Sequence, residues 1–438
     1  MRALMFVPLT MLVWFGPAIT LFAQASKNST PAAAAPPAAV SNRPKHKPAV
    51  TLVDEQIPVT EATKIEPQLI YRMASLAPVK RSVYHKEAHV DFADQIYVIL
   101  RFTRTYDYMH EVVLEPAFRT VRNNPASWDK EHVAEQAYVQ SAIKPWLSVT
   151  AGKKAEFTGS GFFVNPSDLL NENKDVFDPL YQREGVVFSR VQARRGDFSL
   201  GLGFIPERGL AAKAGKPWLT LSGLIADADL KVQATHQESE KTTVGLSAQR
   251  FFGSAFELHT DSRYQARQRG QHEGNVGPSK YSAYAGDNVE IATDDEASGF
   301  YLAGSRYIFT HQRTLVMEYI QNQSGLLPDD FGRYFSDLRE ATKKDKRSVE
   351  NPPTETLGRH YVFLGYQDDA IVKSTHISIN GLQNTDDKSA FVAMIARYHL
   401  SPITSIELAP TFFKGDIDSE FGEMPFANVT YLVFKGRF

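Results

Sequence analysis

Apolar and polar residues alternate with a period of two along most of the chain after Gln95. Side chains of a β-strand point alternately to opposite faces, so this pattern predicts strands with one apolar and one polar face. Each stretch is about ten residues long, the length of a tilted strand that crosses a bilayer. We count seventeen such stretches: 95–106, 109–120, 132–143, 146–156, 184–194, 197–205, 218–225, 228–236, 241–250, 254–264, 298–309, 312–323, 357–367, 373–382, 388–400, 403–413 and 427–438.

The links between these stretches alternate in length. Short links such as Asp107-Tyr108 and Thr310-His311 alternate with links that are mostly long, among them 157–183, 265–297 and 324–356. A bacterial outer-membrane barrel keeps this order because its periplasmic turns are short and its extracellular loops are long, whereas a soluble sandwich has no reason to keep it. The pattern therefore predicts an all-β fold, a transmembrane antiparallel up-and-down β-barrel.

Single-chain bacterial barrels have an even number of strands, so one strand must be added to the seventeen. We expect it before the first stretch, within Lys80 to Phe92, which gives eighteen strands. Sixteen is the alternative, if one stretch is a loop. In either case the barrel domain is predicted to span residues 95–438.

The first residues have the order of a secretory signal peptide. A basic start at Arg2 is followed by an apolar run from Ala3 to Phe22 and by the small-x-small sequence Ala23-Gln24-Ala25. Pro8 and the cleavage sequence favour removal over a permanent membrane anchor. Residues 1–25 are therefore predicted to be a signal peptide.

Two segments separate the signal peptide from the barrel. Residues 26–48 are rich in proline and alanine, a composition that cannot bury a core and predicts a flexible linker. Residues 49–94 are ambiguous, since Val50–Val59 could form a strand and Glu61–Leu76 a weak amphipathic helix. We interpret 49–94 as an N-terminal periplasmic extension or a plug in the lumen.

Composition narrows the choice of class. Hydrophobic residues make up 43% of the chain, the mean hydropathy is -0.30, and no stretch after residue 25 offers the roughly 20 consecutive apolar residues of a membrane helix, which excludes a helical membrane protein. The chain has 0 cysteines, so it forms no disulfide or thiolate metal site. Its 48 basic and 50 acidic residues leave a net charge of -2, which gives no bias toward nucleic acid.

The last strand carries the most specific signal. Its final residues Asn428, Thr430, Leu432, Phe434, Gly436 and Phe438 form one face, while Tyr431, Lys435 and Arg437 fall on the other. This strand resembles the C-terminal recognition strand of Gram-negative outer-membrane barrels, with Tyr431, Phe434 and Phe438 as the candidate assembly signal. The resemblance implies a location in the outer membrane and three partners: the barrel assembly machinery, membrane lipid and lipopolysaccharide.

Residues 151–187 add a second resemblance. Gly152-Lys153 closes a strand, Asn165-Pro166-Ser167-Asp168 starts a turn within the loop, and Arg183-Glu184-Gly185-Val186 opens the next strand. The segment is similar to the first long loop of several porin-like families of Gram-negative bacteria. It implies the barrel and its outer-membrane location.

Charged residues on the strands are expected to face the lumen. A charge on the lipid face costs about 2–4 kcal/mol near the bilayer midplane. Such residues either line a water-filled channel or form salt-bridge networks that fill a narrow lumen, and the sequence leaves both interpretations open. The candidates are Arg101, Arg190, Arg194, Lys231, Glu257, His259, Asp261, Arg263, Arg306, Glu318, Arg359, Arg397 and Glu407.

A barrel of this size is wide, so selectivity must come from a loop that narrows it. Loop 157–183 is more apolar than a loop in water should be, and we expect it to fold against the inner wall or across the mouth. Loop 324–356 carries Arg339, Lys343, Lys344, Lys346 and Arg347 and is expected to stay outside, near the anionic outer leaflet. The candidate constriction residues are Phe162, Phe163, Leu169, Leu170, Phe177 and Tyr181.

These observations predict a porin-like channel for passive passage of small hydrophilic solutes. The alternative is a non-porin barrel that acts as a scaffold or export conduit with a periplasmic partner, motivated by residues 26–94. No enzymatic activity and no cofactor are expected, because His259 and Asp261 lack a serine on their own face and an oxyanion hole. Asp416, Asp418 and Glu420 could gather oxygen ligands for a divalent cation, but solvated acidic loop tips are the preferred interpretation.

Overall fold

The structure is a computed structural model of the 438-residue chain. The predicted signal peptide (1–25) and linker (26–48) lie outside the described residues. The structure describes residues 62–78, 92–106, 109–124, 127–156, 158–170, 185–206, 215–236, 242–265, 298–310, 312–345, 356–369, 371–424 and 426–438.

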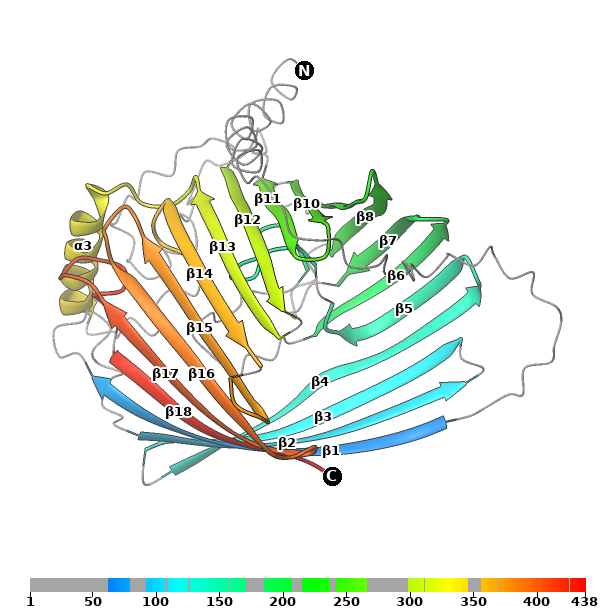
Figure 1. The fold of residues 1–438 in the computed structure, drawn as a ribbon, viewed down its shortest axis with the longest axis horizontal. Helices are drawn as coiled ribbons and strands as arrows, with labels where there is room; N and C mark the ends of the chain where they lie inside the picture. Colours follow the sequence, from blue (N-terminus) through cyan, green and yellow to red (C-terminus); the bar gives the residue numbers. More distant parts are fainter. Residues whose placement is uncertain are drawn as a thin grey trace, which may run out of the picture. The chain divides into compact units, whose positions relative to one another are not determined.

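The described residues form one closed antiparallel sheet of 18 strands, in which neighbours in sequence are also neighbours in space (Figure 1). The sheet closes because the first strand pairs with both the second and the last. The predicted fold class is therefore confirmed, with eighteen strands. Their bounds are β1 Ala62–Pro78, β2 Phe92–Tyr106, β3 His110–Asn124, β4 Ser127–Lys144, β5 Leu147–Lys154, β6 Val186–Arg195, β7 Phe198–Ile205, β8 Lys216–Ile225, β9 Ala228–Thr235, β10 Thr243–Phe252, β11 Phe256–Gln265, β12 Ser298–Thr310, β13 Arg313–Asn322, β14 His360–Asp368, β15 Thr375–Asn384, β16 Ala390–Ser401, β17 Thr404–Lys414 and β18 Phe426–Arg437.

The additional strand does not lie where the sequence placed it. It is β1 at 62–78 rather than a strand within Lys80 to Phe92, so the barrel begins at Ala62 and not at Gln95, and this part of segment 49–94 is wall rather than extension or plug. Both faces of β1 carry apolar residues: Leu69 is exposed on the outside, while Ile70 is buried on the inside. The alternation of apolar and polar residues is therefore weak in this strand, and the spacing of its apolar residues is as typical of a helix as of a strand.

The outer face of the barrel is a belt of exposed apolar side chains. Alternate residues of β7 and β8, such as Leu200, Leu202 and Leu221, point outward and are exposed. Exposed aromatic residues, including Trp146 and Phe198, lie beside the short turns. An apolar band edged by aromatic residues matches the hydrocarbon core and interface of a bilayer.

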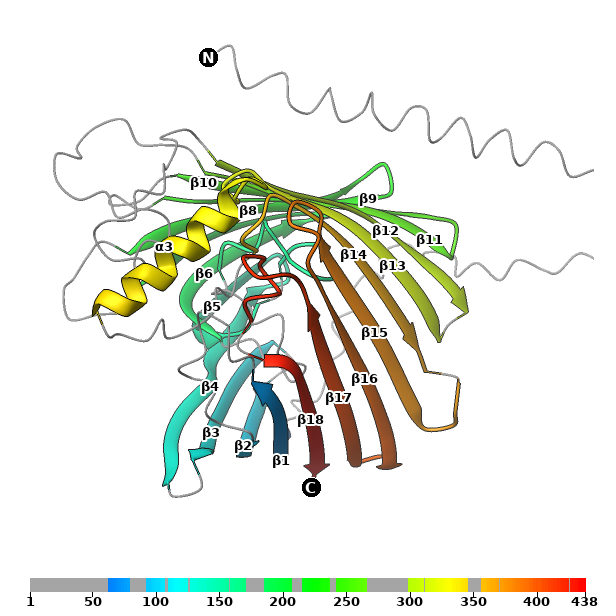
Figure 2. The same ribbon diagram turned by 90° about the vertical axis from the view of Figure 1, so that its left-hand side faces the viewer.

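The two rims differ in their connections. Short turns and the C-terminus share one rim, where the Arg437 N–H donates to Ile403 O of the β16–β17 turn. The opposite rim carries the longer loops, among them the helix α3 (Asp330–Asp345) between β13 and β14 (Figure 2). Within the described residues, no helix combines the length and the apolar character that a membrane crossing requires.

Candidate functional site

The loop after β5 runs inside the barrel along its wall. Two carboxylates on the wall strands β11 and β13, which lie on either side of β12, hold it by backbone hydrogen bonds. Glu318 on β13 accepts the N–H of Phe162 at 2.6 Å and that of Phe163 at 3.0 Å. Asp261 on β11 accepts the N–H of Ser160 at 2.8 Å. A carboxylate that accepts several N–H groups fixes the backbone path strongly, because each bond is charge-assisted.

The same carboxylate of Asp261 makes a second attachment further along the loop. It accepts both the N–H and the hydroxyl of Ser167, the hydroxyl at 3.0 Å, and Ser167 is fully buried. Gln233 on β9 donates to Ser167 O at 2.9 Å. Gly159 allows the close approach, since it has a φ of +94° and an added Cβ would lie 2.6 Å from Asp261 Oδ2.

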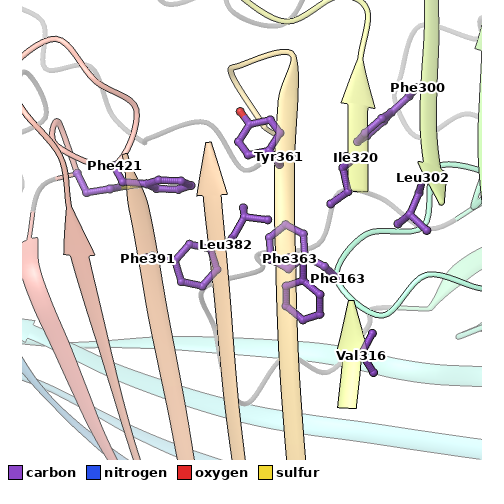
Figure 3. Close-up of a cluster of buried hydrophobic side chains, with 11 residues drawn as sticks. Phe163, Phe300, Leu302, Val316, Ile320, Tyr361, Phe363, Leu382, Phe391 and Phe421 are labelled. Atoms are coloured by element: carbon purple, nitrogen blue, oxygen red, sulfur yellow. The ribbon is translucent and has the colours of Figure 1, made fainter. Parts of the chain in front are cut away.

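Apolar residues of the loop pack on an apolar part of the inner wall. The Phe163 ring lies 5.2 Å from that of Phe363 and 5.9 Å from that of Phe391, between centroids (Figure 3). The buried hydrophobic cluster around Phe163 contains residues from each strand from β12 to β16. Further along, Leu170 packs against Phe188 of β6 and Trp218 of β8.

The loop therefore crosses from the β13 side of the wall to the β6 side. Packing against the inner wall is confirmed for 158–170, where Phe162, Phe163 and Leu170 contact the wall; Leu169 is half-buried. Phe177 and Tyr181 lie outside the described residues. Constriction of the pore by this loop stays a prediction.

A network of charged and polar side chains on the wall strands lies next to the loop. Nε2 of the fully buried His259 lies 3.1 Å from Glu318 Oε1, and its Nδ1 lies 3.4 Å from Glu257 Oε1. Arg306 pairs with the same Glu257, and its guanidinium lies 5.2 Å from the ring centroid of Phe162. The wall and the loop are thus joined by one continuous polar network.

Most other candidate lumen residues also lie on the inner face and have partners. Arg397 pairs with Glu407 at 2.7 Å, and Lys435 reaches the same carboxylate at 3.3 Å. Arg101 lies 3.9 Å from Glu115. The remaining candidates with a printed contact follow the same pattern: Arg190 pairs with Glu156, Arg263 lies over the Phe300 ring at 5.5 Å, and Arg194 Nε donates to Gly196 O at 3.3 Å.

Two candidates stand apart. Arg359 precedes β14 and belongs to the mouth, where its Nε donates to Gly325 O at 2.8 Å. Lys231 on β9 makes no ion pair or hydrogen bond with any residue in the described part of the chain. Sequence reasoning missed the partners Glu115, Glu156 and Lys435, although period two places each on the same face as its cation.

The β17–β18 loop is a second inward-folded element, which the sequence did not predict. Phe421 packs on the lumen cluster, 5.4 Å from the Phe391 ring between centroids. The fully buried Glu420 carboxyl accepts the Leu357 N–H at 2.9 Å, the Tyr361 hydroxyl at 2.6 Å and the Asn384 amide at 2.7 Å. These contacts tie the loop to β14 and β15.

The prediction of solvated loop tips is therefore wrong for the buried Glu420 and for Asp418, which is half-buried, whereas Asp416 is exposed as expected. Burial raises the pKa of Glu420 to about 7, even though its three hydrogen bonds favour the ionised form. Asp418 pairs with Arg339. The described residues contain no group of three or more His, Cys, Asp or Glu side chains that could hold a metal ion.

The helix α3 corrects the prediction that loop 324–356 is wholly exposed. One face of α3, formed by Phe331, Phe335 and Leu338, is buried with Leu357. Arg339 does not face the outer leaflet but pairs with Asp418 and Glu423 of the β17–β18 loop. Polar residues dominate loop 324–356, so this short amphipathic stripe gives only a weak signal in the sequence. The side chains of Lys343, Lys344, Lys346 and Arg347 lie outside the described residues.

The candidate assembly residues divide between the two faces of β18. Phe434 and Phe438 point outward and are exposed. Tyr431 lies on the inner face, where the Arg72 guanidinium is 3.8 Å from its ring centroid. Its role in assembly stays a prediction.

No protein-family model and no curated protein matches the chain. Solved structures do resemble it. Pseudomonas aeruginosa OpdK, determined with vanillate, has a TM-score of 0.54 at 10% identity, covering 86% of this chain and 98% of that one. P. aeruginosa OccK2 (OpdF) has a TM-score of 0.53 at 9% identity, covering 86% and 97%. Acinetobacter baumannii OccAB2 has a TM-score of 0.52 at 10% identity, covering 86% and 98%.

At such identities the likeness concerns the fold. The closed barrel, its apolar outer belt and these neighbours agree with the predicted outer-membrane location. The chain thus has the 18-stranded β-barrel fold of Gram-negative outer-membrane porins.

Proposed function

We propose that this protein is an outer-membrane channel for passive passage of small hydrophilic solutes. The observation that carries the proposal is the inserted loop, held to the inner wall by Glu318 and Asp261. A wide barrel needs a narrowing element to select solutes, and a loop anchored at several points along the wall can supply one. The partners of such a channel are outer-membrane lipid, lipopolysaccharide and, during biogenesis, the barrel assembly machinery.

The lumen wall supports this proposal. Its ion pairs, such as Arg190–Glu156 and Arg397–Glu407, place charges of both signs on the inner face of the barrel, and charged groups along a pore favour the passage of hydrophilic solutes. OpdK was determined with vanillate, which supports solute handling by barrels of this fold. A catalytic role is not proposed, because His259 is enclosed by Glu257, Glu318 and the Phe162 ring.

Single-channel recording in planar bilayers tests the proposal. The refolded protein should produce discrete ion-conducting steps in KCl solution. Circular dichroism and the shift in gel migration between heated and unheated samples establish that the barrel is folded. A folded barrel that carries no current above the baseline would rule out the channel.

A further inference from the structure

A polar pocket of about 430 Å³ lies between the inserted loop and the wall strands β8 to β10. It is placed toward the rim with short turns, since residues beside the β6–β7 and β8–β9 turns line it. Ligand sites for small molecules have volumes of about 300–1,000 Å³. The pocket therefore has room for one small solute beside the loop.

Two groups in this pocket have unused hydrogen-bonding capacity. Lys231 offers an ammonium with three donors, yet no residue in the described ranges forms an ion pair or hydrogen bond with it. The Thr158 hydroxyl is buried, with only 3% of the residue exposed, and has no partner among the described residues. A buried polar group without a partner is costly, so a bound ligand would be stabilised by bonding to it.

The charges on the residues that line the pocket balance. Arg194 and Lys231 contribute two positive charges, and Asp197 and Asp229 contribute two negative charges. An ion of either sign therefore meets both attraction and repulsion. Net charge gives the pocket no reason to prefer an anion or a cation.

The uncharged lining adds donors and acceptors of modest strength. Thr158, Ser160, Ser222 and Ser247 supply hydroxyls, and Gln249 supplies an amide. No aromatic side chain lines the pocket in the described residues, so stacking gives no preference for an aromatic solute. A ligand hydroxyl both donates and accepts, and so can bond to the Lys231 ammonium, a carboxylate or a hydroxyl.

We propose that this pocket is a binding site for a neutral polyhydroxylated solute of about the size of a hexose. The proposal rests on the proposed function, because it names the solute class that the channel holds beside its inserted loop. Lys231 and Thr158 are the residues that recognise ligand oxygens.

Three solutes of matched size and different charge test the class: glucose, gluconate and glucosamine. Affinity is measured by isothermal titration calorimetry on the detergent-solubilised barrel and by block of the single-channel current. Glucose should bind saturably and more tightly than gluconate or glucosamine. Tighter binding of gluconate or glucosamine, or no saturable glucose binding, would overturn the proposal.

Variants test the site. Lys231→Met removes the ammonium and should weaken glucose binding about tenfold, the change expected for loss of one charge-assisted hydrogen bond. Thr158→Val keeps the shape of the side chain and should weaken binding to a smaller extent. Lys216→Met is the matched control, since Lys216 is on β8 but does not line the pocket. Equal effects of Lys231→Met and Lys216→Met would overturn the assignment.

The channel proposal and the binding-site proposal would be overturned by different results. A folded barrel that binds glucose but passes no KCl current would overturn the channel and support the binding site. A barrel that conducts KCl normally but does not bind glucose by calorimetry would overturn the binding site alone.

Discussion

At the residue scale, Glu318 shows how one carboxylate can position a loop. It accepts two consecutive backbone N–H groups, from Phe162 and Phe163. In Glu318→Gln the side chain keeps one carbonyl oxygen that can accept a hydrogen bond. Its NH₂ group is itself a donor, so it cannot accept a hydrogen bond from the second backbone N–H. The loop anchor should lose on the order of 1.5–3 kcal/mol, the value of a hydrogen bond to a charged group. The measurable result is greater fluctuation of the open-channel current.

Glu407→Gln is the control for this prediction. Glu407 is equally buried and charged, but its partners Arg397 and Lys435 belong to the wall. Current fluctuations in this variant should stay closer to those of the unmodified protein. If both variants were equally noisy, the anchoring role of Glu318 would be refuted.

The burial of Glu420 leads us to expect that the stability of the β17–β18 loop depends on pH. Its pKa of about 7 lies above the ordinary carboxyl value of 4.5, because burial disfavours the charged form and Asp387 adds repulsion. The native loop thus binds a proton more tightly than the unfolded loop does. The resulting stabilisation is fully present below pH 4.5 and is lost as the pH rises through 7.

Hydrogen exchange of the Leu357 and Phe421 amides, corrected for the intrinsic pH effect, measures this change. Protection should be lower at pH 8, about one unit above the pKa, than at pH 5.5, about one and a half units below it. Glu420→Gln, which stays neutral, should make protection nearly independent of pH over this range. A pH dependence that persists in the variant would contradict the assignment to Glu420.

At the element scale, α3 and the β17–β18 loop are held together across the mouth by Arg339. It pairs with Asp418 and with the fully buried Glu423. Arg339→Ala would leave a buried carboxylate without its cation, which typically costs about 3–5 kcal/mol. We expect faster hydrogen exchange in both α3 and residues 415–424.

Arg333→Ala provides the matched control, because Arg333 is an exposed arginine on the same helix. It should change exchange much less. Equal exchange in the two variants would show that the ion pairs of Arg339 do not hold the elements together.

The inserted loop leads to a prediction about conductance. Replacing residues 160–181 by a short Gly/Ser linker removes the segment that Glu318 and Asp261 hold against the wall. If this segment constricts the pore, single-channel conductance should rise. Unchanged conductance in a folded barrel would show that the constriction lies elsewhere.

At the scale of the whole molecule, the sequence was sufficient to predict the barrel because lipid imposes a strict alternation on its strands. Each of the seventeen predicted stretches corresponds to a strand from β2 to β18. The alternation fails where the lumen is apolar, as at Ile70 on β1. The contacts of Phe421 and Arg339 could not be predicted, since they join loops whose meeting depends on how the barrel closes.

The position of β1 predicts that two N-terminal deletions differ sharply. Removing residues 26–58 leaves β1 intact, so the barrel should fold and conduct as the full chain does. Removing residues 26–94 deletes β1, which pairs with β2 on one side and β18 on the other. Both neighbours would then expose unpaired N–H and C=O groups in lipid, each costing several kcal/mol.

Heat-dependent gel migration and circular dichroism distinguish the two deletions. The shorter deletion should give the compact, heat-sensitive band of a closed barrel, and the longer one should not. A compact, conducting product from the longer deletion would mean that β2 and β18 can pair directly, in which case β1 is not needed for closure.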